Sequence, residues 1–165
     1  MKLLTSILLI AFLISSADAQ DLKKEINTQV WKPFIEAYNS FDTEKFMSVY
    51  SRNLIRVPVD QKKIFDYSEY KLNINRENHF NKNYKIKAAL EIRFTSRIHE
   101  KDLGYEAGIL KIKLTDNNGK PATIYSRFQV LLKKESGTWK IFFDTDTSEA
   151  SAASETDFNK AEALE

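Results

Sequence analysis

Hydrophobic residues first recur at helical spacing, three or four positions apart, over 26–41. This spacing predicts an amphipathic helix whose inner face carries Ile26, Val30, Phe34, Ala37, Tyr38 and Phe41. Pro33 lies inside the segment and predicts a kink or a restart, because proline lacks a backbone donor and clashes with the preceding turn. Asp42 is a suitable N-cap for a second, short helix over 46–50. The chain therefore begins its folded part with a pair of helices.

A strand and a third helix are predicted next. Leu54–Val57 is expected to form a first strand that ends at Pro58. Asp66 and Glu69 have the Asp-x-x-Glu spacing of a capping box, which predicts the start of a third helix. The apolar residues of that helix are Tyr70, Ile74 and Phe80.

After residue 83 the hydrophobic period changes from helical to two, which predicts a series of strands. In the first strand Ile86, Ala88, Leu90, Ile92, Phe94, Ser96 and Ile98 alternate with Lys87, Ala89, Glu91, Arg93, Thr95, Arg97 and His99. The pattern continues over 110–114, 124–132 and 139–143, with turns at Asn118-Gly119 and Gly137. The last strand is expected to turn three residues inward, Trp139, Ile141 and Phe143. Helices followed by hairpin-linked strands indicate an α+β fold, in which a curved antiparallel sheet packs one concave face on three N-terminal helices.

The first 19 residues are predicted to be a secretory signal peptide. Lys2 supplies the positive end, 3–14 the apolar stretch, and Ala17-Asp18-Ala19 the small residues before a cleavage site at Gln20. Twelve residues are too few to span a bilayer, which needs about 20. We therefore expect an exported protein, periplasmic or secreted, with no membrane partner after cleavage; an uncleaved anchor or a buried strand is the alternative.

Composition and charge refine the domain boundaries. With 165 residues, the chain has the length of a single domain, here assigned to 20–147, and its lack of cysteine excludes disulfides, thiolate metal sites and a cysteine nucleophile. Five acidic residues and one lysine give 148–165 a net charge of −4, against +2 for the whole chain. This acidic C-terminal tail, rich in Ser and Ala, is expected to be loosely ordered apart from a short helix starting at Glu155.

Three stretches carry a resemblance to a known superfamily. They are 34–42 with the helix that follows, Leu103-Gly104-Tyr105-Glu106-Ala107-Gly108, and Arg127 to Lys134 with Gly137 to Ile141. In order and spacing they resemble the nuclear transport factor 2-like superfamily, in its SnoaL-like and ketosteroid-isomerase-like branch. The resemblance spans roughly 22–147 and implies a cone-shaped fold with a pocket at the open end. Because this fold hosts enzymes, binding modules and scaffolds, it does not by itself give a function.

The isomerase chemistry of that branch is not expected here. The resemblance places the branch's catalytic tyrosine at Phe34, which has no hydroxyl, and its carboxylate base near Val57-Pro58, where no carboxylate stands. Asp60 is close in sequence, but a shift of the loop would be needed to aim it. The chain therefore departs from the isomerase pattern where proton transfer occurs.

Strand parity gives the candidate pocket residues. If the even-numbered apolar set faces the helices, the ligand-binding candidates are Phe34, Tyr38, Tyr70, Glu106, Ser126 and Phe128. Tyr67 is an alternative to Tyr70 on the third helix. A carboxylate in an apolar pocket can act as an acid or base, so Glu106 is the candidate for that role. In the competing interpretation Glu106 lies at a solvated rim and the tyrosines are core residues. If a bulge inverts the parity, Arg127, Gln129 and Asp144 become pocket residues instead.

Metal and cofactor sites are not expected. His79 and His99, the two histidines, are predicted to lie at the surface, and they do not have metal-ligand spacing. Asp144, Asp146, Ser148 and Glu155 fit positions 1, 3, 5 and 12 of a calcium loop, but Glu149 stands where glycine is needed. The chain has no glycine-rich phosphate loop, and its basic and aromatic residues alternate along strands, so neither a nucleotide cofactor nor a nucleic-acid partner is predicted.

Three functional interpretations remain open. The leading one is the binding of a small apolar or amphipathic molecule in the cone. The others are a cofactor-free lyase or isomerase that uses Glu106 with a tyrosine, and an interaction module whose pocket is filled by side chains. The outer sheet face carries Ile109, Tyr125, Leu131 and Phe142, which is compatible with a homodimer formed sheet to sheet or with a solvent-facing sheet.

Overall fold

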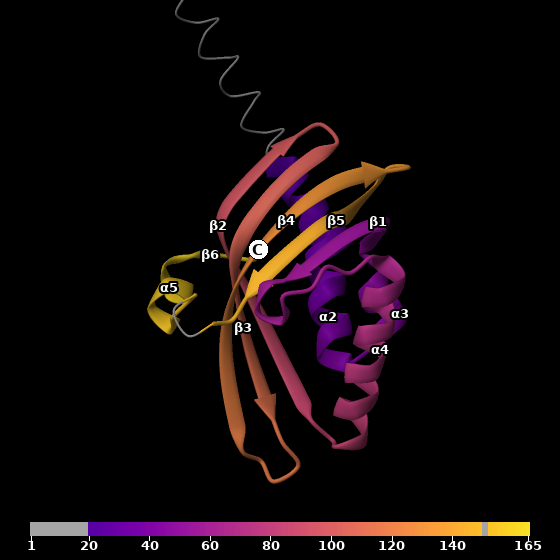
Figure 1. Ribbon diagram of the computed structural model, residues 1–165. Coiled ribbons are helices and arrows are strands. Elements are labelled where there is room, and N and C mark those ends of the chain that lie inside the picture. Colours follow the sequence, from indigo (N-terminus) through magenta and orange to yellow (C-terminus); the bar gives the residue numbers. More distant parts are fainter. Residues whose placement is uncertain (1–19, 150–151) are drawn as a thin grey trace, which may run out of the picture.

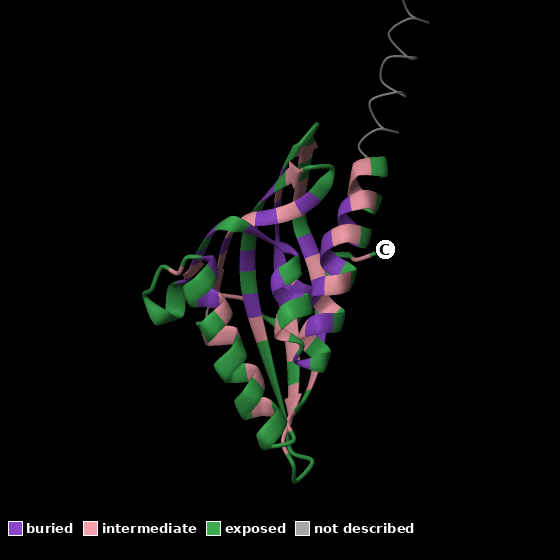
Figure 2. Cartoon of the chain, turned by 90° about the vertical axis from the view of Figure 1, so that its right-hand side faces the viewer, coloured by how far each residue is buried: buried purple, intermediate pink, exposed green. Residues whose placement is uncertain are grey.

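The computed structural model describes residues 20–149 and 152–165. The predicted signal segment therefore lies outside the described residues. Figure 1 shows a long curved sheet with helices α2, α3 and α4 on one side and the short helix α5 on the other. Viewed from the side, the molecule tapers toward one end, and the buried residues lie where the helices and the sheet face one another (Figure 2). In the described part of the chain, no helix combines the length and apolar character needed to cross a bilayer.

The first helix does not break at its proline. Helical backbone over 20–26 passes through a π-helical turn, η1 (Asn27–Trp31), directly into α2 (Lys32–Ser40). Pro33 lies at the start of α2, immediately after this wide turn. A π turn interrupts the usual ladder of hydrogen bonds, so a proline beside it removes less than it would from a regular helix interior. Where the sequence predicts a kink or a restart at Pro33, the structure has a π-helical turn that continues into the α-helix.

The predicted caps begin the next two helices. The Asp42 side chain accepts a hydrogen bond from the Lys45 amide at the start of α3 (Thr43–Ser48). Asp66 and Glu69 form a complete capping box at the start of α4 (Tyr67–Asn83). Between them lie the strand β1 (Tyr50–Pro58) and the 3-10 turn η2 (Val59–Gln61). The caps are where the sequence predicts them, but α3 ends at Ser48, and Tyr50, expected in that helix, begins β1. The strand therefore starts four residues before the expected Leu54.

In the part of the chain that the structure describes, six strands form one sheet in the order β1-β5-β4-β3-β2-β6. The four long strands are antiparallel neighbours: β2 (Lys87–Glu100), β3 (Leu103–Thr115), β4 (Pro121–Glu135) and β5 (Thr138–Thr147). β1 pairs with β5 in parallel, which corrects the expectation of a purely antiparallel sheet. Hydrophobic periodicity indicates which face of a strand is buried but not the direction of its neighbour, so the sequence could not specify this pairing.

A β-bulge in β2 reverses which side chains face the helices. Phe94 pairs with Gly108, but Ser96 pairs with Ala107, so Thr95 is the extra residue. Beyond the bulge the odd-numbered residues point inward, and Ile98, expected inside, is 62% exposed. At this bulge the backbone of β2 lies very close to Gly108 of β3: a Cβ built on Gly108 would lie 2.1 Å from the Arg93 carbonyl oxygen. Only glycine, which has no Cβ, fits there.

A second bulge does the same in β5. Leu131 pairs with Phe143 while Leu132 pairs with Ile141, which leaves Phe142 as the extra residue. Trp139 and Ile141 are buried as expected, but Phe143 is not part of the core, and Asp144 is buried in its place. The bulge therefore turns an acidic end of the strand toward the helices.

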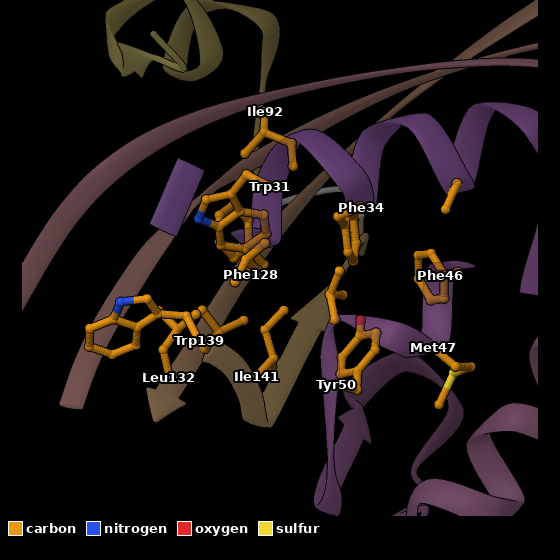
Figure 3. Close-up of a cluster of buried hydrophobic side chains, with 14 of the residues drawn as sticks. Trp31, Phe34, Phe46, Met47, Tyr50, Ile92, Phe128, Leu132, Trp139 and Ile141 are labelled. Carbon is orange, nitrogen blue, oxygen red and sulfur yellow. The ribbon is translucent and has the colours of Figure 1, made fainter. Parts of the chain in front are cut away.

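Aromatic side chains dominate the core between the helices and the sheet (Figure 3). The Trp31 ring lies 5.6 Å from Phe34, 5.5 Å from Phe94 and 5.3 Å from Phe128, measured between ring centroids. These separations are typical of edge-on and tilted aromatic pairs, which add stability beyond the area they bury. The helix η1–α2 is thereby fixed to the inner face of the sheet.

The C-terminal segment packs on the outer face of the sheet, which corrects the expectation of a loosely ordered tail. The expected helix from Glu155 is present as α5 (Glu155–Lys160), and β6 (Glu162–Ala163) pairs with β2. Phe158 is 1% exposed, and its ring centroid lies 6.0 Å from that of Tyr125. Ile109, expected on an open outer face, is fully buried. Phe158 thus packs the segment over residues expected at a dimer interface, and Leu164 adds a second apolar contact, with the core.

Candidate functional site

A cavity of about 240 Å³ lies between the inner face of the sheet and helices η1, α2, α3 and α4. Its aromatic walls are Trp31, Phe34, Tyr38, Phe46, Tyr50, Tyr70 and Phe128. Aliphatic side chains complete the apolar part, from Pro58, Ile74, Leu90, Leu110, Ile112, Val130 and Ile141. Polar residues gather at one end, namely Arg56, Asp60, Gln61, Glu77, Asp144, Asp146 and Ser148. The interior is therefore hollow rather than filled, with apolar walls and one charged end.

Four of the six predicted pocket residues line this cavity. Phe34 and Tyr38 reach it from α2, Tyr70 from α4 and Phe128 from β4. The three helical residues follow from the helical spacing of apolar positions in the sequence, and Phe128 follows from strand alternation. Glu106 and Ser126 share the inner face, as predicted, but neither lines the cavity.

Glu106 belongs to a separate buried ion cluster. One of its oxygens lies 2.8 Å from Arg97 Nε and 2.6 Å from His99 Nε2, and the other accepts the indole N–H of Trp31. Arg97 also donates to the side chain of Asn27 at 2.6 Å. Glu106 does not line the cavity, and its two oxygens bind Arg97, His99 and Trp31, so a molecule in the cavity does not contact its carboxylate.

The same cluster corrects the placement of His99. The side chain of His99 is 2% exposed, whereas His79 is exposed as predicted. The bulge at Thr95 is the cause, since it turns the odd-numbered residues of β2 inward beside Glu106. Ser126 is likewise structural: its hydroxyl donates to the Thr147 carbonyl at 2.9 Å and so ties β4 to β5.

The charged end of the cavity connects β1 to β5. The Tyr50 hydroxyl donates to Asp144 Oδ2 at 2.8 Å, and a terminal nitrogen of Arg56 lies 2.6 Å from Asp146 Oδ1. The other terminal nitrogen of Arg56 lies 3.5 Å from Asp144 Oδ1. Asp144 and Asp146 face the cavity only because of the bulge in β5. Arg56 is thus held between two carboxylates, with its Nε buried and without a partner among the described residues.

Burial raises the pKa values of three side chains at the charged end of the cavity. It raises the pKa of the Asp144 carboxyl, although the charge of Arg56 opposes the shift. It also raises the pKa of Tyr50 and Tyr70, and the charge of Asp144 adds to the effect on both. Tyr50 and Tyr70 therefore stay protonated, and the Tyr50 hydroxyl donates to Asp144. Asp144 holds its proton to a higher pH than an exposed aspartate, because burial raises its pKa.

The mouth of the cavity is formed by exposed residues of η2, α4 and the end of β5. Asp60 accepts hydrogen bonds from the Ser148 amide at 2.7 Å and the Thr147 hydroxyl at 2.5 Å, and these bonds lower the pKa of its carboxyl. Burial, together with the charges of Glu77 and Asp146, raises the pKa of Tyr38 to about 12. At the charged end of the cavity, acidic side chains therefore extend from the buried Asp144 to the exposed Asp60 at the mouth.

Of the three residues that the alternative strand parity names, one lines the cavity. Asp144 is a cavity residue, as that alternative expected, while Arg127 and Gln129 remain exposed because β4 carries no bulge before them. Sequence reasoning did not identify Tyr50, Arg56 or Asp146 as cavity residues. The closely spaced acids Asp144 and Asp146 after an apolar strand are a usable signal, but the sequence indicates Asp144 as a pocket residue only under the alternative parity, and Asp146 only as part of the calcium pattern.

The calcium pattern does not form a site among the described residues. Arg56 occupies the space between Asp144 and Asp146, and Glu155 begins α5 on the opposite side of the sheet. In residues 20–149 and 152–165, no three acidic or histidine side chains are placed to hold a metal ion.

No family model matches the chain, and no curated protein matches it in sequence. Solved structures match in shape. An NTF2-like protein with a cystatin-like fold from Novosphingobium aromaticivorans has a TM-score of 0.70 at 10% identity, over 86% of this chain and 90% of that one. An NTF-2 like protein of unknown function from Shewanella oneidensis has 0.56 at 20%, over 73% and 94%.

A ketosteroid isomerase-like protein from Erwinia carotovora atroseptica gives a TM-score of 0.57 at 10% identity, over 76% of this chain and 98% of that chain. The chain therefore has the nuclear transport factor 2-like, ketosteroid-isomerase-like fold, as the resemblance implied. Identities this low establish the fold alone. Two residues bear on the isomerase chemistry of that branch. Phe34, which stands where the resemblance places the catalytic tyrosine, lies in the cavity wall and has no hydroxyl. Asp60, the carboxylate nearest in sequence to the expected base, accepts hydrogen bonds from Thr147 and Ser148.

Proposed function

We propose that this domain binds a small molecule with an apolar body and one polar end. The observation that supports this is the partly enclosed cavity of about 240 Å³, which has aromatic walls and charged groups at one end only. An apolar cavity of about 150 Å³ is large enough to hold a benzene ring. A single substituted ring, or an aliphatic molecule of that size, therefore fits the available space.

The walls are suited to holding such a body in a fixed orientation. The Phe46 ring lies 5.5 Å from Tyr50 and 6.3 Å from Tyr70, and Tyr50 and Tyr70 meet edge to face at 84°. Rings packed in this way hold one another in place, so the cavity keeps its shape when empty. A preformed cavity loses little conformational entropy on binding, which favours affinity.

A pair of variants tests this proposal. Val130 points into the cavity, and its neighbour Leu131 points to the outer face, where it is 38% exposed. Calorimetric titration with 4-methylbenzyl alcohol should give saturable one-to-one binding in the parent protein and in Leu131→Phe. Val130→Phe should lose it, because the added ring fills the hollow. Failure of the parent protein to bind this probe, or equal binding by Val130→Phe, would contradict the proposal.

Acid–base catalysis is the second candidate function. The specific observation is Asp144, a buried carboxyl with a raised pKa that contacts Tyr50 and lines the cavity. It takes over the role first considered for Glu106. A carboxyl whose pKa approaches the working pH can donate or accept a proton, as a cofactor-free isomerase or lyase requires.

Proton exchange tests this second candidate without knowledge of the natural substrate. The protein in deuterated water should accelerate exchange of the α-protons of phenylacetone, as followed by NMR, and Asp144→Asn should remove the acceleration. Equal rates with and without the protein would leave binding as the supported function.

We propose further that the protein is exported after cleavage before Gln20, because the first 19 residues carry the pattern of a signal peptide. Mass spectrometry of protein recovered from its own host should give a mature chain that begins at Gln20. A chain that retains Met1 in the exported fraction would contradict this assignment.

A homodimer formed sheet to sheet also remains a proposal. Because α5 covers Ile109 and packs on Tyr125, such a dimer would have to use the uncovered part of the outer face around Leu131. Sedimentation of the parent protein and of Leu131→Glu should then give a dimer and a monomer, respectively. A monomeric parent protein would rule the dimer out.

A further inference from the structure

The charge of the cavity is one-sided. Four of its lining residues are acidic, Asp60, Glu77, Asp144 and Asp146, and one is basic, Arg56. Even with Asp144 protonated, the acidic residues outnumber the single arginine. Because a cavity bounded by apolar walls screens charge less than water does, this excess acts strongly on anything that enters.

The arginine is not available to receive an anion. Its two terminal nitrogens are directed at the two aspartates, one at 2.6 Å from Asp146 Oδ1 and the other at 3.5 Å from Asp144 Oδ1. The side chain of Arg56 is 9% exposed. A ligand carboxylate would have to displace Asp146 from Arg56, and it would then be repelled by the acids that lie nearby. Both effects lower the affinity of the cavity for an anion.

Acceptor groups, in contrast, remain accessible. Asp146 is 26% exposed, and Arg56 engages only one of its oxygens, while Oδ2 accepts no hydrogen bond from the residues described. Glu77, on the opposite side of the opening, makes a single side-chain hydrogen bond, from Asn73. The polar end of the cavity therefore offers carboxylate oxygens to a group that carries N–H donors.

The aromatic walls favour the same kind of group. Rings of Tyr38, Phe46, Tyr50 and Tyr70 line the cavity, with neighbouring centroids 5.5 to 6.3 Å apart. Arg56 lies over the Tyr70 ring, 5.4 Å from its centroid, so the rings of Tyr38, Phe46 and Tyr50 are the ones left for a ligand. The negative faces of aromatic rings attract cations, and ammonium groups are commonly bound by several rings together. We propose that the occupant of the cavity is a small organic amine, with its ammonium group between Asp146 and the tyrosine rings and its apolar body against Phe34 and Phe128. This inference rests on the proposed binding function.

The test compares probes that share one ring and differ only in the charge of the head group. 4-Methylbenzylamine, 4-methylbenzyl alcohol and 4-methylbenzoate are titrated separately and followed by calorimetry at pH 7. We expect the amine to bind at least tenfold more tightly than the alcohol, and the benzoate at least tenfold more weakly. Asp146→Asn should reduce the preference for the amine to threefold or less while the affinity for the alcohol is kept.

Two further variants complete the design. Glu77→Gln removes an exposed acid from the mouth without touching the Arg56 contacts and should lower the preference for the amine about threefold. Glu100→Gln, the same change at an exposed site that does not line the cavity, should leave the preference unaltered. If the alcohol binds and the amine binds no better, the amine assignment fails while the binding function stands. If none of the three probes binds, both fail.

Discussion

The hydroxyl of Tyr50 donates a 2.8 Å hydrogen bond to the carboxylate of Asp144 at the closed side of the cavity's charged end. The two residues come from the parallel pair β1 and β5 and are 94 positions apart in the chain. The contact exists because the bulge at Phe142 turns Asp144 inward. It joins the edge strand to the sheet and fixes a carboxyl group in the cavity wall.

Loss of this hydroxyl should weaken the fold measurably. Tyr50→Phe leaves the buried Asp144 oxygen without its donor, and such a loss costs about 1–3 kcal/mol. Urea unfolding should show that decrease, whereas Tyr84→Phe, which removes a hydroxyl from an exposed ring, should change the stability by less than about 0.5 kcal/mol. Equal effects of the two substitutions would contradict the assigned contact.

Stability should depend on pH through Asp144. Because burial raises its pKa in the folded protein, the folded state keeps this proton to a higher pH than the unfolded chain, where aspartate titrates near about 3.9. Protonated Asp144 therefore contributes its full stabilisation at pH values below the pKa of the unfolded chain. This contribution is lost as the pH rises through the raised pKa of the folded protein.

The parent protein should therefore lose stability relative to Asp144→Asn as the pH increases over that window. Urea unfolding of both proteins between pH 3.5 and 8 measures the difference. Asp102→Asn, which removes an exposed acid, corrects for the change in net charge. A difference that stays constant, or that grows in favour of the parent protein, would refute the raised pKa.

Glu106 should prove to be a structural residue. In Glu106→Gln, the buried Arg97 loses its charged partner, and breaking a buried ion pair typically costs about 3–5 kcal/mol. Thermal or urea unfolding should report this loss, with Glu100→Gln as the matched exposed control. The folded variant should still bind 4-methylbenzyl alcohol with unchanged affinity; loss of binding at full stability would return Glu106 to the binding site.

The bulge in β2 should not tolerate a side chain at Gly108. A Cβ there would lie 2.1 Å from the Arg93 carbonyl oxygen and 2.8 Å from the Phe128 ring, so backbone must move in Gly108→Ala. Overpacking of this kind costs about 1–3 kcal/mol or more. Gly104→Ala is the control, since its nearest neighbour is the His99 side chain at 3.2 Å. We expect a clearly smaller decrease for Gly104→Ala, and the reverse order would contradict the described register.

Phe158 should be responsible for the attachment of the C-terminal segment. Its side chain is 1% exposed, and truncation of a buried phenylalanine costs about 3–5 kcal/mol where the site cannot close up. In Phe158→Ala, hydrogen exchange should accelerate at β6 and along the Arg93 region of β2, which pairs with it. Phe80→Ala, at an exposed ring, provides the comparison. Unchanged exchange at β6 would show that other contacts hold the segment.

Much of the fold was predictable from local signals. The caps at Asp42 and Asp66, the turns at Gly119 and Gly137, and the alternation of β3 and β4 gave the elements in their order. Spacing put Tyr38, Phe128 and either Tyr67 or Tyr70 on inward faces, and the family resemblance implied the pocket that they line. These features depend on residues within a few positions of one another, which is the range over which periodicity and capping operate.

The positions of the buried charged side chains were harder to predict from the sequence. Each of these positions depends on a β-bulge or on the direction of a neighbouring strand. A strict period of two puts Arg97 and His99 outside and Phe143 inside, and a single extra residue in β2 or β5 reverses these positions. The pairing of Tyr50 and Arg56 with β5 depends on a parallel contact between strands remote in sequence. Gly108, with backbone closely opposed to it, is the clearest mark that a bulge leaves in the sequence itself.

The central claim is that a small molecule occupies the hollow between Tyr38, Tyr70 and Phe128 rather than the surroundings of Glu106. Nuclear Overhauser contacts between 4-methylbenzyl alcohol and the assigned protein test it most directly. We predict contacts from the probe's ring protons to those three aromatic rings, and their loss in Val130→Phe. Contacts to His99 or to outer-face residues such as Leu131, with none to the three rings, would contradict the account.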